Sequence, residues 1–446
     1  MGLFRFFATG PDLPPMQDQG RIDSLFRRHR FRVMLAITLG YGLIYTCRLA
    51  LGVVKKPLID GGVFTPAELG MIGSALFYTY ALGKLTNGFL ADHANMRRFL
   101  AFAFLMTALC NIGMGFMTTV WGAVILWGLN GWFQSFGAPG GVVAMTAWFS
   151  NRERGRAYGV WSTAHSIGEG LTFLAVGSLV AAAGWQWGFW GPGVIGIVTA
   201  IGCYLLIQDR PRTMGLPAVA DWKNDHYAEA PKDSARTVIG LQFSILKIPA
   251  IWVLALASAT TYVTRYAINS WGVLYMQEER GFSLPMAGTL LMVSTVAGIV
   301  GAIGFGVVSD KIFNARRAPA NLIFAILELI GLGLIFFGPT NLPVLITGMV
   351  LFGMGLTGLV TSLGGLFAVD IAPKRVAGAA MGVIGIFSYI GAAVQEQVSG
   401  LLIDRGMTMV DGVRTYDFGP AIWFWIGSSV ISMLLAASLW RTKLRD

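Results

Sequence analysis

Residues 41–54 read YGLIYTCRLALGVV, an apolar run with one arginine, Arg48, well inside it. The run lies in a longer hydrophobic segment, 31–54, which is long enough to cross a bilayer as a helix. A guanidinium at the centre of such a helix costs about 2.5–3.5 kcal/mol on insertion scales, so it needs a counter-charge or a function. Arg48 is therefore the first candidate functional residue.

The composition is that of a polytopic membrane protein. Of the 446 residues, 55% are hydrophobic and only 13% are charged, and the mean hydropathy is +0.63. Apolar runs recur at intervals of about 30 residues and are each long enough to span a bilayer. They predict an all-α membrane protein with twelve transmembrane helices: 31–54, 66–91, 98–118, 120–149, 155–183, 187–207, 249–277, 284–309, 318–338, 343–370, 376–403 and 418–440.

The distribution of positive charge argues against a nucleic-acid partner, although the net charge is +10. If the chain starts inside, 25 of its 33 lysines and arginines fall in cytoplasmic segments and 3 fall within spans. The other 5 fall outside, at Lys55, Lys56, Arg280, Arg405 and Arg414. This excess of cations inside follows the positive-inside rule and predicts that both termini are cytoplasmic.

Two sequence devices occur twice. Residues 261–271 read TYVTRYAINSW, where Arg265 repeats Arg48 at an offset of 217 residues. GFLADHANMRR at 88–98 recurs as GVVSDKIFNARR at 306–317. Such a duplication indicates two pseudo-symmetric six-helix halves, a known plan of transporters. The predicted organisation is an N-terminal arm at 1–30, a first half at 31–208, a linker at 209–247, a second half at 248–440 and a tail at 441–446.

The duplicated device at the inner surface combines a carboxylate with paired arginines. We expect these residues to latch the inner side of each half in one conformational state; the alternative is that they only fix the topology. The candidate gating residues are Asp92, Arg97, Arg98, Asp310, Arg316 and Arg317.

Further polar residues lie inside the predicted spans. Lys84 falls near mid-membrane, and Gly137 to Gly141 should loosen the fourth span. His165 and Glu169 are four residues apart and share a helix face. Glu169 has three open roles: it holds His165, it holds a sugar hydroxyl, or it carries a proton. Glu396 is similarly open.

The charged residues within the spans can also be interpreted without a bound ligand. Arg48, Lys84 and Arg265 are formally matched by the three acids Glu169, Glu328 and Glu396, so internal pairing is the alternative. For Glu328 we favour a packing position. His165 has the alternative of a hydrogen-bonded interior histidine.

Enzymatic chemistry is not expected. The three cysteines fall within apolar spans and the four histidines are scattered, which gives no metal-ligand set. The glycine-rich patches lie within spans, where they suit close helix contact, and no nucleophile has a base at useful spacing. We therefore expect neither a cofactor nor a metal.

Several motifs together resemble one family. The duplicated GxxxD…RR device, NGWFQ at 130–134, WFSNRERG at 148–155, TAH at 163–165 and YVTRYAINSW at 262–271 are similar to the organophosphate:phosphate antiporters of the major facilitator superfamily. The resemblance covers nearly the whole chain. The linker opening, at 209–222, is most similar to the hexose-phosphate members, including the membrane sensor of that group.

The resemblance implies a function and assigns residues to it. It implies that Arg48 and Arg265 bind the phosphoryl group, that Lys84 adds positive charge nearby and that His165 contacts the substrate. The chemistry agrees, because a guanidinium fork can hold two oxygens of a phosphate. Other candidate substrate-binding residues, on the same spans or facing them, are Tyr45, Tyr262, Tyr266, Trp271, Gln134, Glu169 and Glu396.

The sequence departs from the family pattern at several positions. Leu49 replaces a common lysine, Val143 an arginine, Thr295 a glutamate and Ser270 an aspartate, and the acids Glu169 and Glu396 are new. These departures concern the recognition of the rest of the substrate more than the capture of phosphate.

The expected function is exchange of a hexose or triose phosphate for inorganic phosphate by alternating access. It would take place in a bacterial cytoplasmic (inner) membrane, with the protein as a monomer in the lipid bilayer. One alternative is a sensor of the same fold that binds hexose phosphate and signals to a membrane kinase. The other is proton-coupled transport of another organic anion, motivated by Glu169 and Glu396.

Overall fold

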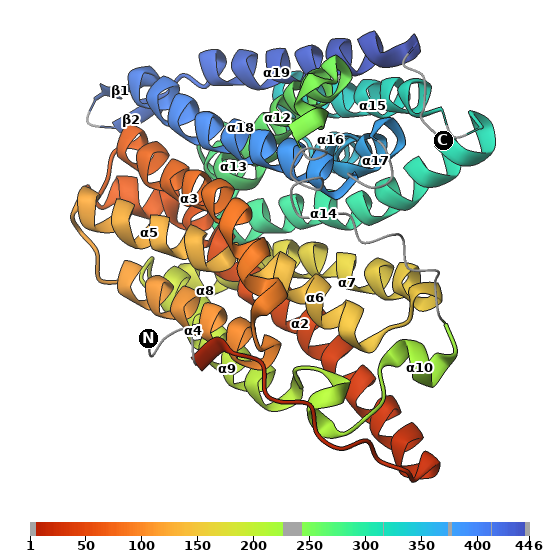
Figure 1. Ribbon diagram of the computed structural model, residues 1–446. Coiled ribbons are helices and arrows are strands. Elements are labelled where there is room, and N and C mark those ends of the chain that lie inside the picture. The colour runs from red at the N-terminus through yellow and green to blue at the C-terminus, as the bar shows by residue number, and fades with distance from the viewer. Residues whose placement is uncertain (1–5, 226–242, 315, 373–376, 412, 442–446) are drawn as a thin grey trace.

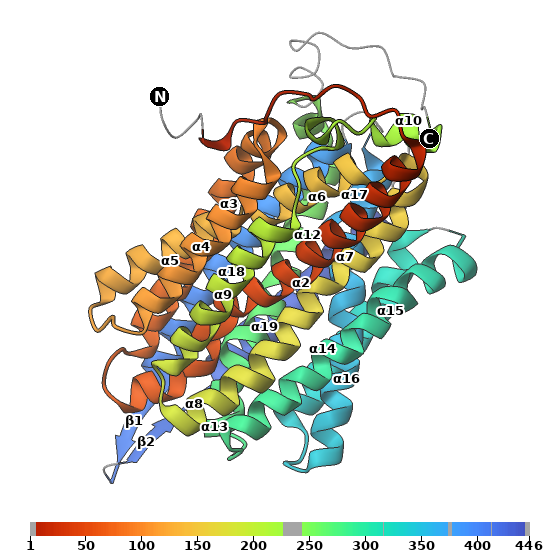
Figure 2. The ribbon, with the colours of Figure 1, turned by 90° about the horizontal axis from the view of Figure 1, so that it is seen from below.

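The protein is a bundle of long helices that run alongside one another (Figures 1 and 2). The computed structural model describes residues 6–225, 243–314, 316–372, 377–411 and 413–441. The predicted all-α membrane fold is confirmed, with a single short hairpin added among these residues, in which β1 (Met407–Val410) pairs antiparallel with β2 (Val413–Tyr416).

The helices fall into two groups, which occupy the lower and upper parts of Figure 1. The first group is α2 (Gln19–Asp60), α3 (Pro66–His93), α4 (Met96–Met114), α5 (Val120–Gln134), α6 (Gly137–Trp148), α7 (Asn151–Leu171), η1 (Thr172–Val176), α8 (Gly177–Ala183) and α9 (Trp187–Leu206). The second group is α12 (Pro249–Tyr266), η4 (Ala267–Trp271), α13 (Gly272–Glu278), α14 (Leu284–Val307), η5 (Val308–Ile312), α15 (Arg317–Phe337), α16 (Leu342–Thr361), η6 (Ser362–Leu366), α17 (Phe367–Ile371), α18 (Ala377–Gly406) and α19 (Gly419–Ser438). Short helical turns lie outside the groups: η2 (Pro211–Met214), α10 (Val219–Lys223), η3 (Ile245–Lys247) and η8 (Leu439–Arg441).

Nine of the helices within the described residues are long and apolar enough to cross a membrane. Three further predicted spans, 66–91, 120–149 and 249–277, coincide with helical segments that begin at Pro66, Val120 and Pro249. The largest difference is in the first span, because α2 extends well beyond 31–54 at both ends.

Polar capping residues explain where several of the helices begin. Thr65 and Glu68 form a capping box at the start of α3, and Ser150 and Glu153 form another at the start of α7. The side chain of Asn95 accepts from the backbone N–H of Arg98 at the start of α4. These caps satisfy backbone N–H groups that have no partner within the first turn of each helix.

Several of the long helical segments are interrupted along their length. The predicted loosening of the fourth span is confirmed, because α5 ends at Gln134 and α6 begins at Gly137. The seventh span has a π-helical turn at η4, between Arg265 and Gly272. Such turns are common at functional sites, since they rotate the following side chains relative to a regular helix.

The two ends of the bundle differ. At one end, called the arm end, residues 6–18 lie across the helix ends, with Leu13 N donating to Arg212 O and Asn95 N donating to Phe7 O. At the other, the hairpin end, β1 and β2 project from the bundle (Figure 2). Across the boundary between the groups, α3 packs against α18 and α7 against α14. These helices form the boundary between the two groups.

Candidate substrate site

Arg48 lies in the middle of α2 and is 3% exposed. Its Nε donates to Gln134 Oε1 at 2.8 Å, and its Nη1 donates to the hydroxyl of Tyr389 at 3.3 Å. The rings of Tyr45 and Tyr80 lie 4.6 Å and 4.3 Å from its guanidinium carbon. Among the described residues no carboxylate forms an ion pair with Arg48, so a buried positive charge remains open to an anion.

The broken fourth span holds Arg48 in place. Gln134 donates through Nε2 to Asn130 Oδ1 at 2.9 Å, and Asn130 donates to the carbonyl of Cys47 at 3.0 Å. The NGWFQ motif therefore fixes both the backbone beside Arg48 and the amide that orients its guanidinium. Gln134 has the positioning contact expected of a site residue.

Arg265, the second predicted arginine, forms an ion pair. Its Nη2 lies 3.1 Å from Glu169 Oε1, an oxygen that also accepts from Asn269 Nδ2. Its guanidinium carbon lies 5.7 Å from the ring centres of both Tyr262 and Tyr266. Glu169 is therefore held by the second group of helices, and it forms no hydrogen bond with His165 in the part of the chain described.

Tyrosine rings connect the surroundings of the two arginines. The ring of Tyr389 lies 4.3 Å from that of Tyr80 and 5.6 Å from that of Tyr262. Lys84 Nζ lies 4.9 Å from the centre of the Tyr389 ring. The structure thus gathers Arg48, Arg265 and Lys84 around one set of aromatic side chains.

His165 is half-buried beside this set. Its ring contacts those of Tyr41 at 5.1 Å and Tyr45 at 5.3 Å, both edge-on, and that of Trp161 at 6.4 Å. The histidine therefore lies one helix turn from Glu169 but within an aromatic environment on the first group.

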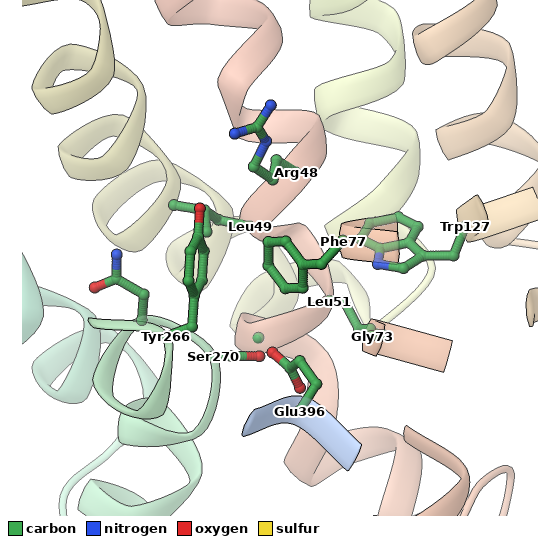
Figure 3. Close-up of a pocket in the computed structure, with 11 residues that line it drawn as sticks. Arg48, Leu49, Leu51, Gly73, Phe77, Trp127, Tyr266, Ser270 and Glu396 are labelled. Atoms are coloured by element: carbon green, nitrogen blue, oxygen red, sulfur yellow. The ribbon is translucent and has the colours of Figure 1, made fainter. Parts of the chain in front are cut away.

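A layer of aromatic side chains lies on the hairpin side of Arg48. The rings of Phe77 and Tyr266 are 4.3 Å apart and lie between Arg48 and the pair Ser270 and Glu396 (Figure 3). The small cavity there is also lined by Trp127, Asn269 and the backbone of α2, and the side chains leave little free space in it. In the described part of the chain, the cavity on the hairpin side of Arg48 is therefore too small for a substrate.

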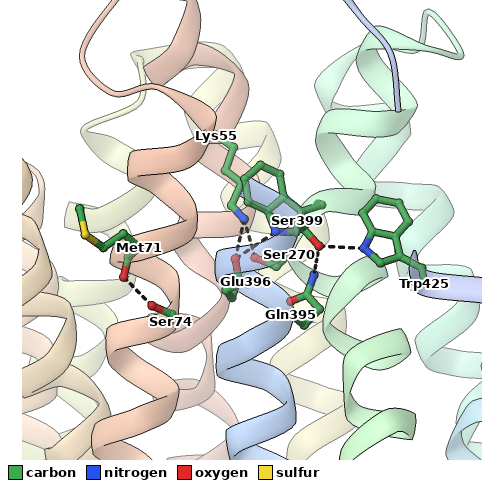
Figure 4. A network of polar contacts seen from close by, with 9 residues as sticks. Lys55, Met71, Ser74, Ser270, Gln395, Glu396, Ser399 and Trp425 are labelled. Carbon is green, nitrogen blue, oxygen red and sulfur yellow. Dashed lines mark hydrogen bonds and ion pairs between the residues drawn. The ribbon is translucent and has the colours of Figure 1, made fainter. Parts of the chain in front are cut away.

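Beyond this layer lies a buried ion pair that the sequence analysis missed. Lys55 Nζ lies 3.0 Å from Glu396 Oε2 and donates to Ser270 Oγ at 2.8 Å (Figure 4). Trp271 Nε1 donates to the same carboxylate oxygen at 3.0 Å, and its ring lies 3.3 Å from Lys55 Nζ. Glu396 and Trp271, predicted as substrate ligands, are thus placed with Lys55 rather than with the arginines.

The assignment of Lys55 to an outer loop is wrong. The structure places it inside α2, fully buried, because the helix continues to Asp60 and because a carboxylate from α18 compensates its charge. Nearer the hairpin end, Lys56 pairs with Glu278 and lies 3.2 Å from Asp60 Oδ2.

The two copies of the predicted gating device differ. In the second copy Arg317 Nη1 lies 2.6 Å from Asp310 Oδ1, and its Nε lies 2.7 Å from Asp370 Oδ2, whereas the side chain of Arg316 is exposed. The carboxylate and arginine thus meet there as expected.

In the first copy, the same residue types make backbone contacts instead. Arg97 donates to Tyr204 O at 2.6 Å, and Arg98 donates to Phe6 O at 2.9 Å. The carbonyl of Asp92 accepts from Arg210 Nη2 at 3.2 Å. No ion pair between Asp92 and an arginine occurs in the described ranges, so the duplicated sequence does not give a duplicated structure here.

The remaining membrane acid, Glu328, lies away from the arginines. It is fully buried between α15 and α19 and accepts from Ser429 Oγ at 2.8 Å. This matches the packing position expected for it.

Direct polar contacts between the two groups gather at the middle and the hairpin end. Among the described residues they are Arg48–Tyr389, Glu169–Arg265, Glu169–Asn269, Lys55–Ser270, Lys55–Glu396, Lys56–Glu278 and the contacts of Arg414 with Ile59 and Asp60. Backbones also approach closely there: a Cβ on Gly70 would lie 2.5 Å from Glu396 O, and one on Gly288 would lie 2.2 Å from Phe173 O. The structure is thus sealed at the hairpin end.

Comparison with known proteins places this arrangement in a family. The model of the Major Facilitator Superfamily matches residues 8–395. The chain is 34% identical over 402 residues to the membrane sensor protein UhpC of Escherichia coli (strain K12), covering 88% of this chain and 90% of that protein. It is 30% identical over 414 residues to a probable hexose phosphate transport protein of Chlamydia pneumoniae, covering 90% of this chain and 91% of the relative.

A solved structure has the same fold. The bacterial homologue of the human lysosomal transporter Spinster, in an inward-facing and unoccupied conformation, superposes with a TM-score of 0.75 at 17% identity, over 92% of this chain and 96% of that one. The chain belongs to the major facilitator superfamily and, within it, to the organophosphate:phosphate antiporter family.

Proposed function

We propose that the protein is a secondary transporter that exchanges a phosphorylated small molecule, a hexose or triose phosphate, for inorganic phosphate. The observation that carries this proposal is the guanidinium of Arg48, which is 3% exposed and has no carboxylate partner in the described residues. A cation buried at membrane depth favours an anion as its ligand, because leaving it unpaired costs several kcal/mol.

The chemistry around Arg48 suits a phosphoryl group. Within the described residues, Arg48 engages Nε and Nη1 in contacts with the protein and Arg265 engages only Nη2, so N–H groups of both remain available there. Two guanidinium groups can share the three terminal oxygens of a phosphate ester. The hydroxyl of Tyr389 and the ammonium of Lys84 lie next to the same site and add a donor and a charge.

The arrangement of contacts supports alternating access. With the hairpin end sealed by Lys55–Glu396 and by close backbone contacts, the site would communicate with the arm end. Rocking of the two helical groups would break these contacts and open the opposite side. We assign the arm end to the cytoplasm of a bacterial inner membrane, because most of the lysines and arginines outside the spans lie in the segments that end there.

The relatives support the substrate class. One is named a probable hexose phosphate transport protein, and it matches 90% of this chain. A phosphate ester is also the ligand that the two arginines would recognise. Recognition of the rest of the molecule would fall to the tyrosines, His165 and Glu169, which surround the arginines.

Counterflow in proteoliposomes tests this function. Vesicles loaded with inorganic phosphate should take up labelled phosphate, and external glucose 6-phosphate or glycerol 3-phosphate should compete. Arg48→Lys should abolish this uptake, because an ammonium cannot make the two-pronged contact. Arg28→Lys, an exposed position on the same helix, should leave it intact. Phosphate uptake by Arg48→Lys at the rate of the unmodified protein would reject the site.

A second candidate is a sensor that binds a hexose phosphate without moving it. It is favoured by the 34% identity to a membrane sensor protein. The same vesicles distinguish the two functions, since a sensor would bind the labelled ester in detergent but would show no counterflow. A membrane kinase would then be the partner.

A further inference from the structure

Glu169 has an unusual position for a carboxylate, because it lies beside a guanidinium that the proposed function assigns to phosphate. It is 8% exposed. Its Oε1 accepts both of the protein's donors, Arg265 Nη2 at 3.1 Å and Asn269 Nδ2. Its Oε2 has no hydrogen-bond partner in the described ranges.

The contact leaves most of Arg265 available. A guanidinium has five N–H donors, and only Nη2 is engaged by the protein in the residues described. A phosphate can therefore bind the other edge of Arg265 while Glu169 stays in place. Asn269 favours that outcome, since it holds Glu169 Oε1 independently of the arginine. The bound phosphate would then lie only a few ångströms from the carboxylate.

Two negative groups this close inside a membrane protein do not both stay charged, because a like charge nearby and burial each favour the neutral form. Arg48 and Arg265 offset the two charges of a phosphate dianion, and the third cation, Lys84, lies beside Tyr389 and forms no ion pair with Glu169 in the described ranges. The charged or titratable groups that surround the two arginines, on the elements around Glu169, are His165 on α7, Tyr45 and Arg48 on α2, Lys84 on α3, Arg265, Tyr262 and Tyr266 on α12, and Tyr389 on α18. The buried carboxylate of Glu396 on α18 lies beyond the layer of Phe77 and Tyr266 and is paired with Lys55.

We propose that Glu169 couples phosphate binding to the uptake of a proton. When a phosphate dianion binds Arg48 and Arg265, the Glu169 carboxylate takes up one proton on Oε2 and becomes a neutral acid. Its O–H then donates a hydrogen bond to a phosphoryl oxygen, which replaces a repulsion with an attraction. The proton leaves when the phosphate leaves. This inference rests on the proposed function, because it needs phosphate at the two arginines.

Proton release and uptake on binding can be counted directly. Titration of the purified full-length protein with inorganic phosphate at pH 8, in two buffers of different ionisation enthalpy, gives the number of protons bound per phosphate. The unmodified protein should take up about one more proton than Glu169→Gln, and its phosphate affinity should fall about tenfold per pH unit above neutrality. The affinity of Glu169→Gln should change less than twofold over the same range.

Two further variants make the result specific. Glu169→Asp keeps the titratable group and should retain proton uptake. Glu328→Gln removes a buried carboxyl that lies away from the arginines and should leave the proton count unchanged. Equal proton uptake by the unmodified protein and Glu169→Gln would overturn the coupling while leaving phosphate binding established. Absence of phosphate binding by the unmodified protein at every pH would instead overturn the proposed function.

Discussion

Lys55 Nζ and Glu396 Oε2 lie 3.0 Å apart, although 341 residues separate them and each comes from a different helical group. Both side chains are buried from solvent, at 0% and 2% exposure. Ser270 and Trp271 complete the network from a third element, η4. A buried pair of this kind is maintained only while the groups stay together, so it stabilises the conformation that is closed at the hairpin end.

Replacing Lys55 alone should lower the stability of the protein far more than replacing Lys55 and Glu396 together. Lys55→Met leaves a buried carboxylate unpaired and should lower the free energy of unfolding by about 3–5 kcal/mol. The double variant Lys55→Met/Glu396→Leu should recover most of that loss, because a buried ion pair is often replaceable by apolar side chains. Thermal unfolding of the detergent-solubilised proteins measures the stability loss of the single and of the double variant. A loss in the double variant equal to the sum of the losses in Lys55→Met and Glu396→Leu measured singly would show that the pair is not coupled.

Close backbone contact at the hairpin end gives a second prediction. A Cβ on Gly400 would lie 2.6 Å from Pro66 O and 2.8 Å from Gly70 Cα, so Gly400→Leu should prevent the closed arrangement of α3 and α18. The population should shift toward opening at that end. A cysteine introduced at Leu51, which lines the cavity below Arg48, should then react faster with a membrane-impermeant maleimide.

Gly382→Leu is the matched control for this experiment, because it lies on the same helix and a Cβ there meets no atom within 4 Å. It should leave the labelling rate of the introduced cysteine unchanged. If both glycine variants accelerate labelling equally, general loosening of α18 is the cause.

The sequence predicted the parts of this molecule that depend on local physics. Apart from α2, which is longer at both ends, hydropathy located the helical segments to within a few residues, since burial in lipid requires an apolar helix. The repeated arginines identified Arg48 and Arg265, because a charge at such a depth is exceptional in any membrane span. The glycines and proline after Gln134 likewise marked a real break between α5 and α6.

The parts that were missed depend on distant partners. A lysine at the end of a hydrophobic run has the same local pattern whether it reaches water or pairs with a buried acid, so Lys55 was placed in a loop. Tyr389 was not singled out, because a tyrosine within an apolar span is ordinary until Arg48 and Lys84 are found beside it. Glu396 gave no signal of a further buried cation, because the three acids within the predicted spans already matched three cations in number.

Arg317 gives the last prediction, which concerns the second copy of the gating device. Its guanidinium holds Asp310, Asp370 and the hydroxyl of Ser309, and it thereby ties α15 to η5 and α17. Arg317→Ala would leave the half-buried carboxylate of Asp370 without this donor. Charge-assisted hydrogen bonds of this kind contribute about 1.5–3 kcal/mol each, so the variant should melt at a clearly lower temperature.

Arg316→Ala is the natural comparison, since it removes the neighbouring arginine, whose side chain is exposed. It should change the melting temperature little, because exposed charges contribute about 0–1 kcal/mol. If the ion pairs of Arg317 with Asp310 and Asp370 also latch one conformational state, Arg317→Ala should alter the rate of phosphate counterflow, and Arg316→Ala should not. Identical melting temperatures and counterflow rates for the two variants would mean that the contacts of Arg317 contribute neither to stability nor to gating.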